Sequence, residues 1–354
     1  MIDIGHRRLA PELPPIVVAE LSGNHNGSLD SALAIVRAAA DNGAGAIKLQ
    51  TFTAETLTID SSRPEFFIHD PGGLWHGRRL FELYREASTP WEWHEQIFET
   101  ARAAGLLCIS SAFDLSSLKF LLRLRVDAIK IASFELVHIP LIEAAAESGL
   151  PLIVSTGMGT INEIDDAVAA IERHRKSPFV LLKCTSAYPS VEEHANLLTM
   201  VDLGVRYGCE VGLSDHSLRP FTAYTAAALG AVIIEKHVTL SRAAGGIDSA
   251  FSLEPAELKE HAEGIEFVWR SRGAVRYEPQ DVEAASVRER PSIYVTDDVA
   301  QGSRFSPANV RIIRPAGGLA PKHFASVLGK IAQRNVSRGT PLTWDLVAEA
   351  PETM

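Results

Sequence analysis

The sequence predicts an α/β protein built as a (β/α)8 TIM barrel and followed by a small separate domain. Short apolar runs of strand type alternate with stretches of helical spacing, which implies parallel pairing through crossover helices. Eight such units over about 250 residues match the size of a closed barrel. The eight strand-type runs cover residues 15–20, 46–50, 106–110, 127–133, 152–156, 179–184, 211–215 and 231–237.

The connecting segments support this interpretation. Residues 29–44 and 89–106 carry apolar side chains at helical spacing, with Ser31 as the expected N-cap of the first helix and Gly43 at its end. An open doubly wound sheet is the alternative, but no GxGxxG follows the first strand and eight repeats favour closure. Residues 57–88 are too long for an ordinary loop, so we expect a functional segment over the barrel mouth.

The pattern changes near residue 275. Residues 1–274 form the predicted barrel, and residues 275–291 are polar without strand–helix alternation, which indicates a linker. Short strands and turns then fill residues 292–354. A domain of about 60 residues is marginally stable alone, so we expect it to pack on something larger.

Composition and charge exclude several classes of protein. The 354 residues are 46% apolar and 22% charged, which is typical of soluble globular proteins. A net charge of −10 weighs against general nucleic-acid binding. There is no apolar run of about 18 residues and no signal-peptide core, so we expect a cytoplasmic protein without a membrane partner. We expect Cys108, Cys184 and Cys209 to be buried, reduced thiols.

Polar or ionisable residues end all eight predicted strands. The last strand begins with four apolar residues and then turns to Glu235, Lys236 and His237. Unpaired charges are costly in an apolar interior, and barrels of this type build their active site from the carboxyl ends of the strands. We therefore expect all three side chains to face a polar pocket.

Several of these strand ends suggest particular chemistry. His216 and His237 could bind one divalent ion and leave positions open for substrate, or they could be hydrogen-bonded histidines without a metal. Lys48 and Lys130, with nearby hydroxyl and backbone N–H groups, suit a phosphate and a carboxylate. Alternatively, each lysine pairs with a carboxylate such as Glu20 or Glu135. The candidate acid–base or hydroxyl-binding groups are Glu20, Glu235 and Asp248.

Motifs along nearly the whole chain resemble the sialic acid synthases, which condense phosphoenolpyruvate with an N-acylated sugar. They are VVAELSGNHNGS (17–28), AIKLQTF (46–52), IKIASFE (129–135), STGM (155–158), LLKCTSAYPS (181–190), GLSDHS (212–217) and EKHVTL (235–240). Residues 310–342 look like the antifreeze-like (SAF, β-clip) domain that ends these enzymes. Within the family, KCTSAYP, GGIDSAFSLEP (245–255) and ELYREASTPWEWH (82–94) resemble the pseudaminic acid synthase branch.

The match has departures. Sialic acid synthases proper carry Asn where this chain has Ser186, which favours the pseudaminic branch. Ile247 and Ala112 stand where the family pattern has Pro, and Gly23 replaces Ala before the NHN triplet. None of these changes removes an expected catalytic group, although Ile247 adjoins Asp248 and so bears on the choice of sugar.

The resemblance implies roles for individual residues. The phosphoenolpyruvate contacts would be Lys48, Ser111, Lys130, Ser133, Ser155, Ser186, Ser214 and His216. The sugar contacts would be Glu20, Gln50, Tyr188, Glu235 and Asp248. His216 and His237 would hold a divalent cation, Mn²⁺ or Mg²⁺, and Glu20 is the candidate proton-transfer group. In a domain-swapped homodimer, Arg314 of one chain would reach the barrel of its partner.

The reaction implied is the condensation of phosphoenolpyruvate with 2,4-diacetamido-2,4,6-trideoxy-β-L-altropyranose and water, giving pseudaminic acid and phosphate. The same chemistry on another sugar would give N-acetylneuraminic or legionaminic acid. A non-catalytic carbohydrate- or ice-binding protein is the alternative from a different class. The complete set of polar strand ends argues against that alternative.

Overall fold

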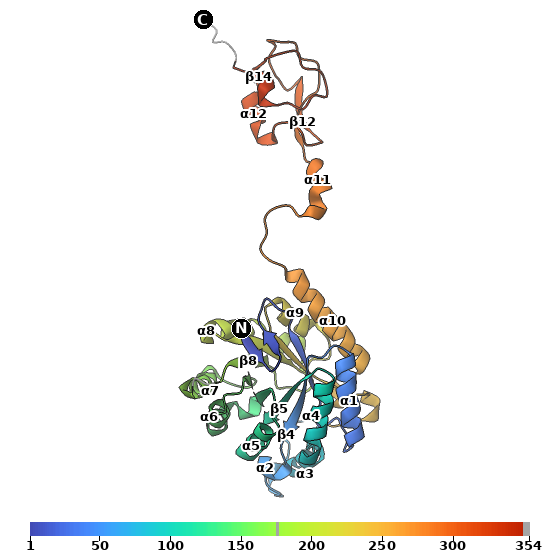
Figure 1. The fold of residues 1–354 in the computed structure, drawn as a ribbon, viewed down its shortest axis with the longest axis vertical. Helices are drawn as coiled ribbons and strands as arrows, with labels where there is room; N and C mark the ends of the chain where they lie inside the picture. The colour runs from blue at the N-terminus through green and yellow to red at the C-terminus, as the bar shows by residue number, and fades with distance from the viewer. Residues whose placement is uncertain (175–176, 350–354) are drawn as a thin grey trace. The chain divides into compact units, whose positions relative to one another are not determined.

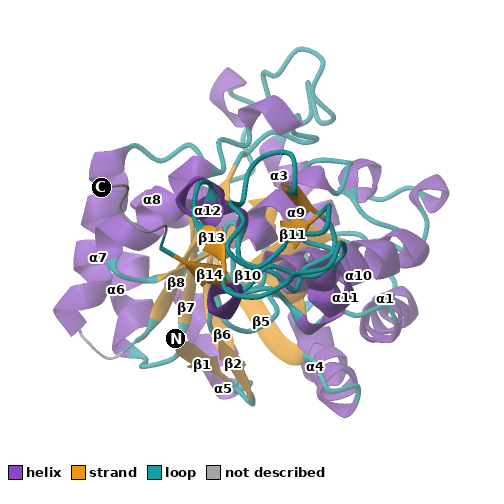
Figure 2. Cartoon of the chain, turned by 90° about the horizontal axis from the view of Figure 1, so that it is seen from above, coloured by secondary structure: helices purple, strands orange, loops and turns teal. Residues whose placement is uncertain are grey.

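Eight parallel strands close into a barrel in the first of two units, Met1–Gly273 (Figures 1 and 2). The computed structural model describes residues 1–174 and 177–349. Around the barrel the strands follow their order in the chain, and the last pairs with the first, as predicted. The strands are β3 (Ile16–Glu20), β4 (Ala46–Thr51), β5 (Leu107–Ala112), β6 (Ala128–Ile131), β7 (Leu152–Ser155), β8 (Phe179–Cys184), β9 (Glu210–Asp215) and β10 (Ile233–His237).

Helices surround the strands (Figure 2). They are α1 (Leu29–Asp41), α2 (Ala54–Leu57), α3 (Leu80–Ala87), α4 (His94–Ala103), α5 (Leu115–Arg123), α6 (Ile139–Glu147), α7 (Ile161–His174), α8 (Leu198–Tyr207), α9 (Phe221–Ala228) and α10 (Pro255–Arg272). The predicted cap of α1 was wrong. Ser28 is the N-cap, and its hydroxyl oxygen accepts a hydrogen bond from the backbone N–H of Ser31 at 3.3 Å. Gly43 follows the end of α1 with φ of +90°, a conformation that favours glycine.

A short hairpin packs against the amino-terminal end of the barrel interior. It consists of β1 (Ile2–Ile4) and β2 (Arg7–Leu9), and its side chains Ile2, Ile4 and Leu9 share a core with the first inward-facing residues of the barrel strands. Gly5 makes the turn with φ of +53°, beside the side chains of Leu107 and Asp127. This end of the barrel is therefore filled with apolar side chains.

The inward-facing positions change from apolar to polar along each strand. In β3, Ile16 and Val18 belong to the inner core, whereas Glu20 ends the strand. In β4, Ala46 belongs to the same core, and Lys48 follows two residues later. Because side chains alternate between the two faces of a strand, these polar groups occupy the carboxyl-terminal half of the interior.

The second unit begins at Ala274 and has its own apolar core, which includes Ile293, Phe305 and Leu342. Its elements are α11 (Ala284–Arg288), β11 (Ser292–Val295), β12 (Val310–Ile313), α12 (Phe324–Val327), β13 (Ile331–Ala332) and β14 (Val347–Ala348). The segment that we predicted as a linker, residues 275–291, thus contains the short helix α11.

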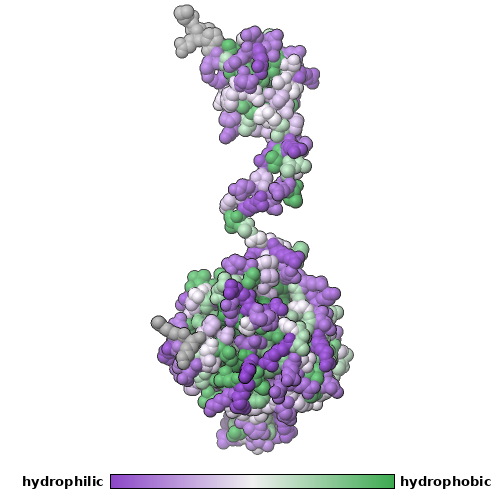
Figure 3. Space-filling model, in the orientation of Figure 1, coloured by the Kyte–Doolittle hydropathy of each residue, from purple (hydrophilic) through white to green (hydrophobic). Residues whose placement is uncertain are grey.

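Hydrophilic residues are spread over the visible faces of both units, with hydrophobic residues between them (Figure 3). In the described part of the chain, no helix combines the length and apolar character needed to cross a membrane. All three cysteines are free thiols. Cys108 and Cys184 are buried as predicted, but Cys209 is only half-buried.

Candidate active site

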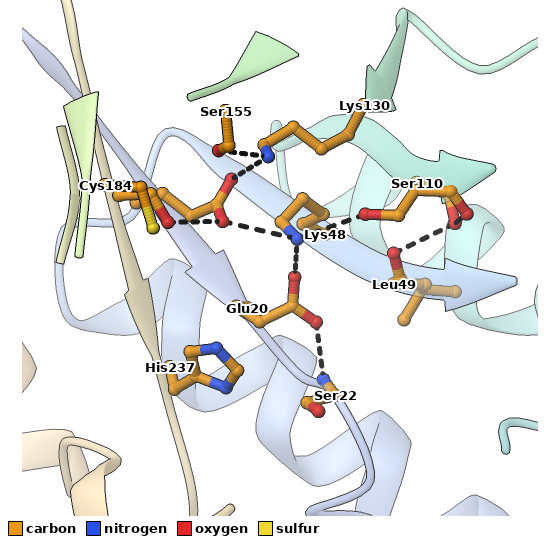
Figure 4. Close-up of polar contacts among 12 residues, drawn as sticks. Glu20, Ser22, Lys48, Leu49, Ser110, Lys130, Ser155, Cys184 and His237 are labelled. Carbon is orange, nitrogen blue, oxygen red and sulfur yellow. Dashed lines mark hydrogen bonds and ion pairs between the residues drawn. The ribbon is translucent and has the colours of Figure 1, made fainter. Parts of the chain in front are cut away.

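Four charged side chains meet inside the barrel (Figure 4). The ammonium group of Lys48 forms an ion pair with the Glu20 carboxylate, and its Nζ lies 3.4 Å from Oε1 of Glu235. Nζ of Lys130 lies 4.0 Å from Oε2 of Glu235 and donates to the Ser155 hydroxyl at 2.5 Å. All four charged side chains are buried. Lys48 therefore does pair with Glu20, which was the simpler of the two alternatives considered for it.

The two carboxyl groups of this cluster have different environments. Burial raises the pKa of Glu20, although the charge of Lys48 opposes the shift. Burial also acts to raise the pKa of Glu235, but the charges of Lys130, Lys48 and His216 outweigh it and lower that pKa. Neighbouring carboxyl groups whose pKa values are pushed apart can take different roles. Glu20 is thus better suited to take up and release a proton. Glu235 is better suited to stay ionised and to balance the charges of the two lysines.

Hydroxyl and backbone N–H groups gather beside the lysines. Lys48 donates to the Ser111 hydroxyl at 3.4 Å, and the backbone N–H of Gly157 donates to the Ser133 hydroxyl at 3.1 Å. A side chain at position 157 would collide with the hydroxyls of Ser133 and Ser186. Glycine is required there by this close approach. The arrangement can hold an anion through two cations and several donors.

His216 and His237 lie next to each other at the open end of the barrel, with ring centroids 5.3 Å apart. Nδ1 of His216 lies 3.0 Å from the Thr185 carbonyl oxygen, to which it donates, so Nε2 is the nitrogen that could bind a metal once it has lost its proton. Nδ1 of His237 is buried, has no hydrogen-bond partner among the described residues, and lies 3.6 Å from Oδ2 of Asp248. Burial and the nearby positive charges of His216 and Lys48 hold the pKa of His237 well below its usual value.

This arrangement fits a divalent cation, because neutral imidazoles are common metal ligands and one buried nitrogen here is unpartnered. Within residues 1–174 and 177–349, however, no group of three or more His, Cys, Asp and Glu side chains is arranged to hold a metal. A cation at the two histidines would therefore need further ligands from water or substrate, which leaves positions open for chemistry.

Asp248 is held in place by residues of the NHN region. The Ser22 hydroxyl donates to its carboxylate, and its backbone N–H donates to the Asn24 side-chain oxygen at 3.3 Å. The amide nitrogen of Asn24 donates to the Val238 carbonyl and the Ser252 hydroxyl, both at 2.8 Å. Asn24 thus ties the loop that carries Asp248 to the end of β10, a function that its sequence position alone did not reveal.

Aromatic rings line the histidine side of the site. Tyr188 lies with its ring centroid 4.5 Å from that of His216, and Phe251 lies 4.9 Å from His237. Trp75, from the segment 57–88, reaches the same cluster, so this segment does extend to the barrel mouth. We did not predict Phe251 or Trp75 as site residues. The unusual length of residues 57–88 was the only signal for Trp75.

Two family models match the chain. One described as the NeuB family matches residues 35–277, and one described as the SAF domain matches residues 290–348. The chain belongs to the NeuB family. This confirms the resemblance to the sialic acid synthases and to their antifreeze-like domain.

Named relatives of this NeuB-family chain cover almost its full length. The pseudaminic acid synthase of Campylobacter jejuni subsp. jejuni (strain 81-176) is 40% identical, over 92% of this chain and 94% of that protein. The pseudaminic acid synthase of Helicobacter pylori is also 40% identical, over 94% and 97%. The crystal structure of N-acetylneuraminic acid synthetase from Leptospira borgpetersenii, in complex with citrate, has a TM-score of 0.71 and 34% identity, over 81% of this chain and 94% of that one.

Some strand-end residues of this NeuB-family barrel do not face the pocket. Lys236 donates to Oδ2 of Asp215 at 3.0 Å and to the Ser217 carbonyl, on the face of the barrel opposite to Glu235. The prediction that all three of Glu235, Lys236 and His237 face the pocket was therefore wrong for Lys236. The reason is the two-residue period of a strand, which sends neighbouring side chains to opposite faces.

Other predicted site residues have varied positions. Ser214 donates to Glu235 at 3.1 Å, and Gln50 is half-buried, opposite Ser111 in the strand register. Arg314 follows β12 in the second unit, where it is exposed, and its role stays a prediction.

Glu135 was considered only as a partner for a lysine. Burial raises its pKa to about 7, with Lys130 opposing, and its Oε2 is buried without a partner.

Proposed function

We propose that this chain condenses phosphoenolpyruvate with 2,4-diacetamido-2,4,6-trideoxy-β-L-altropyranose and water to give pseudaminic acid and phosphate. The observation that carries the proposal is the 40% identity to pseudaminic acid synthases over 92% or more of the chain. The pocket supports the same chemistry, because it combines an anion-binding half with a pair of histidines that could hold a metal.

The anion-binding half would take phosphoenolpyruvate. Its phosphate and carboxylate need cations and hydrogen-bond donors, which Lys48, Lys130 and the surrounding serine hydroxyls provide. On binding, Lys48 and Lys130 would lose part of their contact with Glu235 and would contact the anionic groups of the substrate instead. The ionised Glu235 would still offset the positive charge of both lysines after the product leaves.

We propose that His216 and His237 hold Mn²⁺ or Mg²⁺ in the working enzyme. When bound there, the ion would act as a Lewis acid toward the aldehyde oxygen of the open-chain sugar. Asp248, which lies beside His237, would accept hydrogen bonds from sugar hydroxyls. Tyr188 and Phe251 would exclude water from the same side of the sugar.

The bond changes assign a role to Glu20. A bond forms between C3 of phosphoenolpyruvate and the aldehyde carbon, whose oxygen takes up a proton. The oxygen of water bonds to C2, the bond from C2 to the phosphate oxygen breaks, and the C2 keto group forms as the water gives up both protons, one to replace the proton taken up by the aldehyde oxygen and one to the departing phosphate. Glu20, with its raised pKa and its contact with Lys48, is our candidate for carrying a proton in this sequence.

We further propose a cytoplasmic homodimer in which the second unit of each chain brings Arg314 to the barrel of its partner. The exposed position of Arg314 supports this, and the three free thiols fit a reducing compartment. Co-expression of an Arg314→Ala chain with a His237→Ala chain tests it. Shared sites predict recovered activity in verified mixed dimers, whereas no recovery would show that Arg314 does not act across the dimer.

The function itself is tested by offering phosphoenolpyruvate with a panel of N-acylated amino sugars and measuring phosphate release and product mass. We expect kcat/KM for the 2,4-diacetamido-2,4,6-trideoxy altrose sugar to be more than about 10-fold higher than kcat/KM for N-acetylmannosamine. Equal or better use of N-acetylmannosamine, or of the legionaminic acid precursor, would overturn the assignment. A protein that only binds carbohydrate would release no phosphate.

A further inference from the structure

Trp75 is anchored to the loop that carries Asp248. It lies in the segment 57–88, just before α3, and its indole N–H donates to the backbone carbonyl of Ile247 at 3.2 Å. Ile247 directly precedes Asp248, so the hydrogen bond joins two loops that are far apart in the sequence. This fixes the indole ring over one side of the site.

The rings form a continuous row that starts at the two histidines. Tyr188 lies 4.5 Å from His216, and Phe251 lies 4.9 Å from His237, measured between ring centroids. Trp75 comes next in the row, 5.5 Å from Tyr188 and 6.3 Å from Phe251. Trp75 is therefore the ring most distant from the histidines.

The position of Trp75 determines which part of a sugar it can meet. In the proposed reaction, the aldehyde carbon lies at the histidines. A sugar whose remaining carbon atoms extend along the row of rings would place the end furthest from the aldehyde against Trp75.

The chemistry of the ring limits what it can recognise. The only hydrogen-bond donor of an indole is its N–H, and here it is already bonded to Ile247. The exposed part of Trp75 thus offers apolar and π contact without a donor or acceptor. A methyl group would pack well on this surface, whereas a hydroxyl group would lose its hydrogen bonds to water without replacement.

We propose that Trp75 is a specificity-determining residue that selects amino sugars carrying a methyl group, rather than a hydroxymethyl group, at the end furthest from the aldehyde. The inference rests on the proposed function and sharpens it, because it assigns the choice of a 6-deoxy sugar to one residue. Trp75 takes no part in bond making, so its effect should appear in discrimination between sugars.

The experiment compares two sugars that differ only at C6: the 2,4-diacetamido sugar with a methyl group and its counterpart with a hydroxymethyl group. Phosphate release gives kcat/KM for each with the wild-type chain, Trp75→Ala, Trp75→Phe and Leu74→Ala. Leu74 is the exposed neighbour of Trp75 and serves as the matched control. Thermal unfolding and the KM for phosphoenolpyruvate report whether each variant keeps its fold and its anion-binding half.

We expect the wild-type chain to prefer the methyl sugar by about 10- to 100-fold. Trp75→Ala should reduce that ratio to near one, Trp75→Phe should retain most of it, and Leu74→Ala should leave it unchanged. An unchanged ratio in folded Trp75→Ala, or an equal loss for both sugars, would overturn the inference while leaving the proposed function intact. If the wild-type chain used neither sugar, the proposed function would fail, and this inference with it.

Discussion

Two buried ion clusters lie on opposite faces of strand β10. The inner cluster joins Glu235 to Lys48 and Lys130, and the outer one joins Lys236 to Asp215. Glu235 and Lys236 are neighbours in the chain, yet one faces the barrel interior and the other faces away from it. The two clusters share strand β10, burial and charge types, and they differ in the groups that surround them.

The outer cluster is saturated. The Asp215 carboxylate accepts hydrogen bonds from the N–H and the hydroxyl of Ser217, from the Thr222 hydroxyl at the start of α9, and from Lys236, at 2.9 to 3.1 Å. A carboxylate with this many donors has little capacity left for a ligand. The cluster therefore serves to fasten β9, β10 and α9 together.

Polar groups beside the inner cluster are left unbonded. Among the described residues, Nδ1 of His237 and Oε2 of Glu135 have no hydrogen-bond partner although they are buried. Buried polar groups are normally satisfied, so an unsatisfied group requires an explanation such as a bound ion or substrate. The comparison shows that a buried ion pair is not in itself a sign of an active site. Nor is one unbonded group, since Nε2 of His261, beside Lys236, also lacks a partner among the described residues. The inner face differs because its unbonded groups follow the carboxyl ends of the strands, where barrels of this type bind substrate.

The largest effect that we expect is a loss of activity when His237, beside the inner cluster, is replaced. His237→Ala should lower phosphate release by at least ~10³-fold, since Lewis-acid catalysis is worth several kcal/mol, with little change in thermal stability. Chelation should do the same to the unmodified chain, and Mn²⁺ or Mg²⁺ should restore activity. His6→Ala, at an exposed turn of the hairpin, is the control. Full activity of His237→Ala in chelator would rule out the metal site.

The second prediction compares how the loss of a lysine from each cluster affects stability and activity. Lys236→Met leaves Asp215 buried without a counter-charge and should reduce the free energy of unfolding by about 3 kcal/mol or more. Lys48→Met should destabilise less, because Glu20 can take up a proton, but should lower activity by at least ~100-fold. Urea unfolding and phosphate release measure both. If the two variants lost stability equally, the distinction between the clusters would be wrong.

A milder change tests saturation of the outer cluster. Thr222→Val keeps the shape of the side chain but removes one donor to Asp215, which should cost about 1–2 kcal/mol of stability without loss of activity. Thr225→Val, in the same helix, is the matched control because its hydroxyl bonds only to the carbonyl of Phe221. Equal stability of the two variants in urea would argue against a structural role for the Thr222 bond.

The smallest effect concerns pH and His261, which lies in α10. Burial, together with the charge of Lys236, lowers the pKa of His261 to about 4. Between about pH 6.5 and 4 the unfolded chain therefore binds a proton that the folded chain does not, so stability falls as the pH falls, by up to ~1.4 kcal/mol per pH unit. His261→Gln should reduce this slope, measured from urea midpoints between pH 7.5 and 5. His6→Gln should leave it unchanged.

The sequence was sufficient to predict the barrel because eight apolar runs, each ending in polar residues, repeat at regular intervals. It also indicated where the polar side chains gather, since the carboxyl ends of the strands meet at one end of the barrel. It did not predict that Lys236 faces outward, because we treated three successive residues as a group instead of applying the two-residue period of a strand.

The features that we did not predict differ in the signal that they left in the sequence. The N-cap at Ser28 could have been identified from local spacing, since it precedes the first helical residue directly. The hairpin at residues 2–9 also left a local signal, alternating residues around Gly5. Phe251 left none that distinguishes it from an ordinary packing residue, and Trp75 left only the unusual length of residues 57–88. Their position beside the histidines follows from the folding of long loops, which periodicity does not describe.

The hairpin formed by β1 and β2 has a consequence for the order of events. It fills the amino-terminal end of the barrel with apolar side chains, which leaves no polar route to the interior from that end. Lys48 and Lys130 lie within their strands. A ligand of the lysines would therefore have to arrive from the carboxyl-terminal end of the barrel. A sugar bound at the histidines would then lie above it, so we expect the anionic substrate to bind before the sugar.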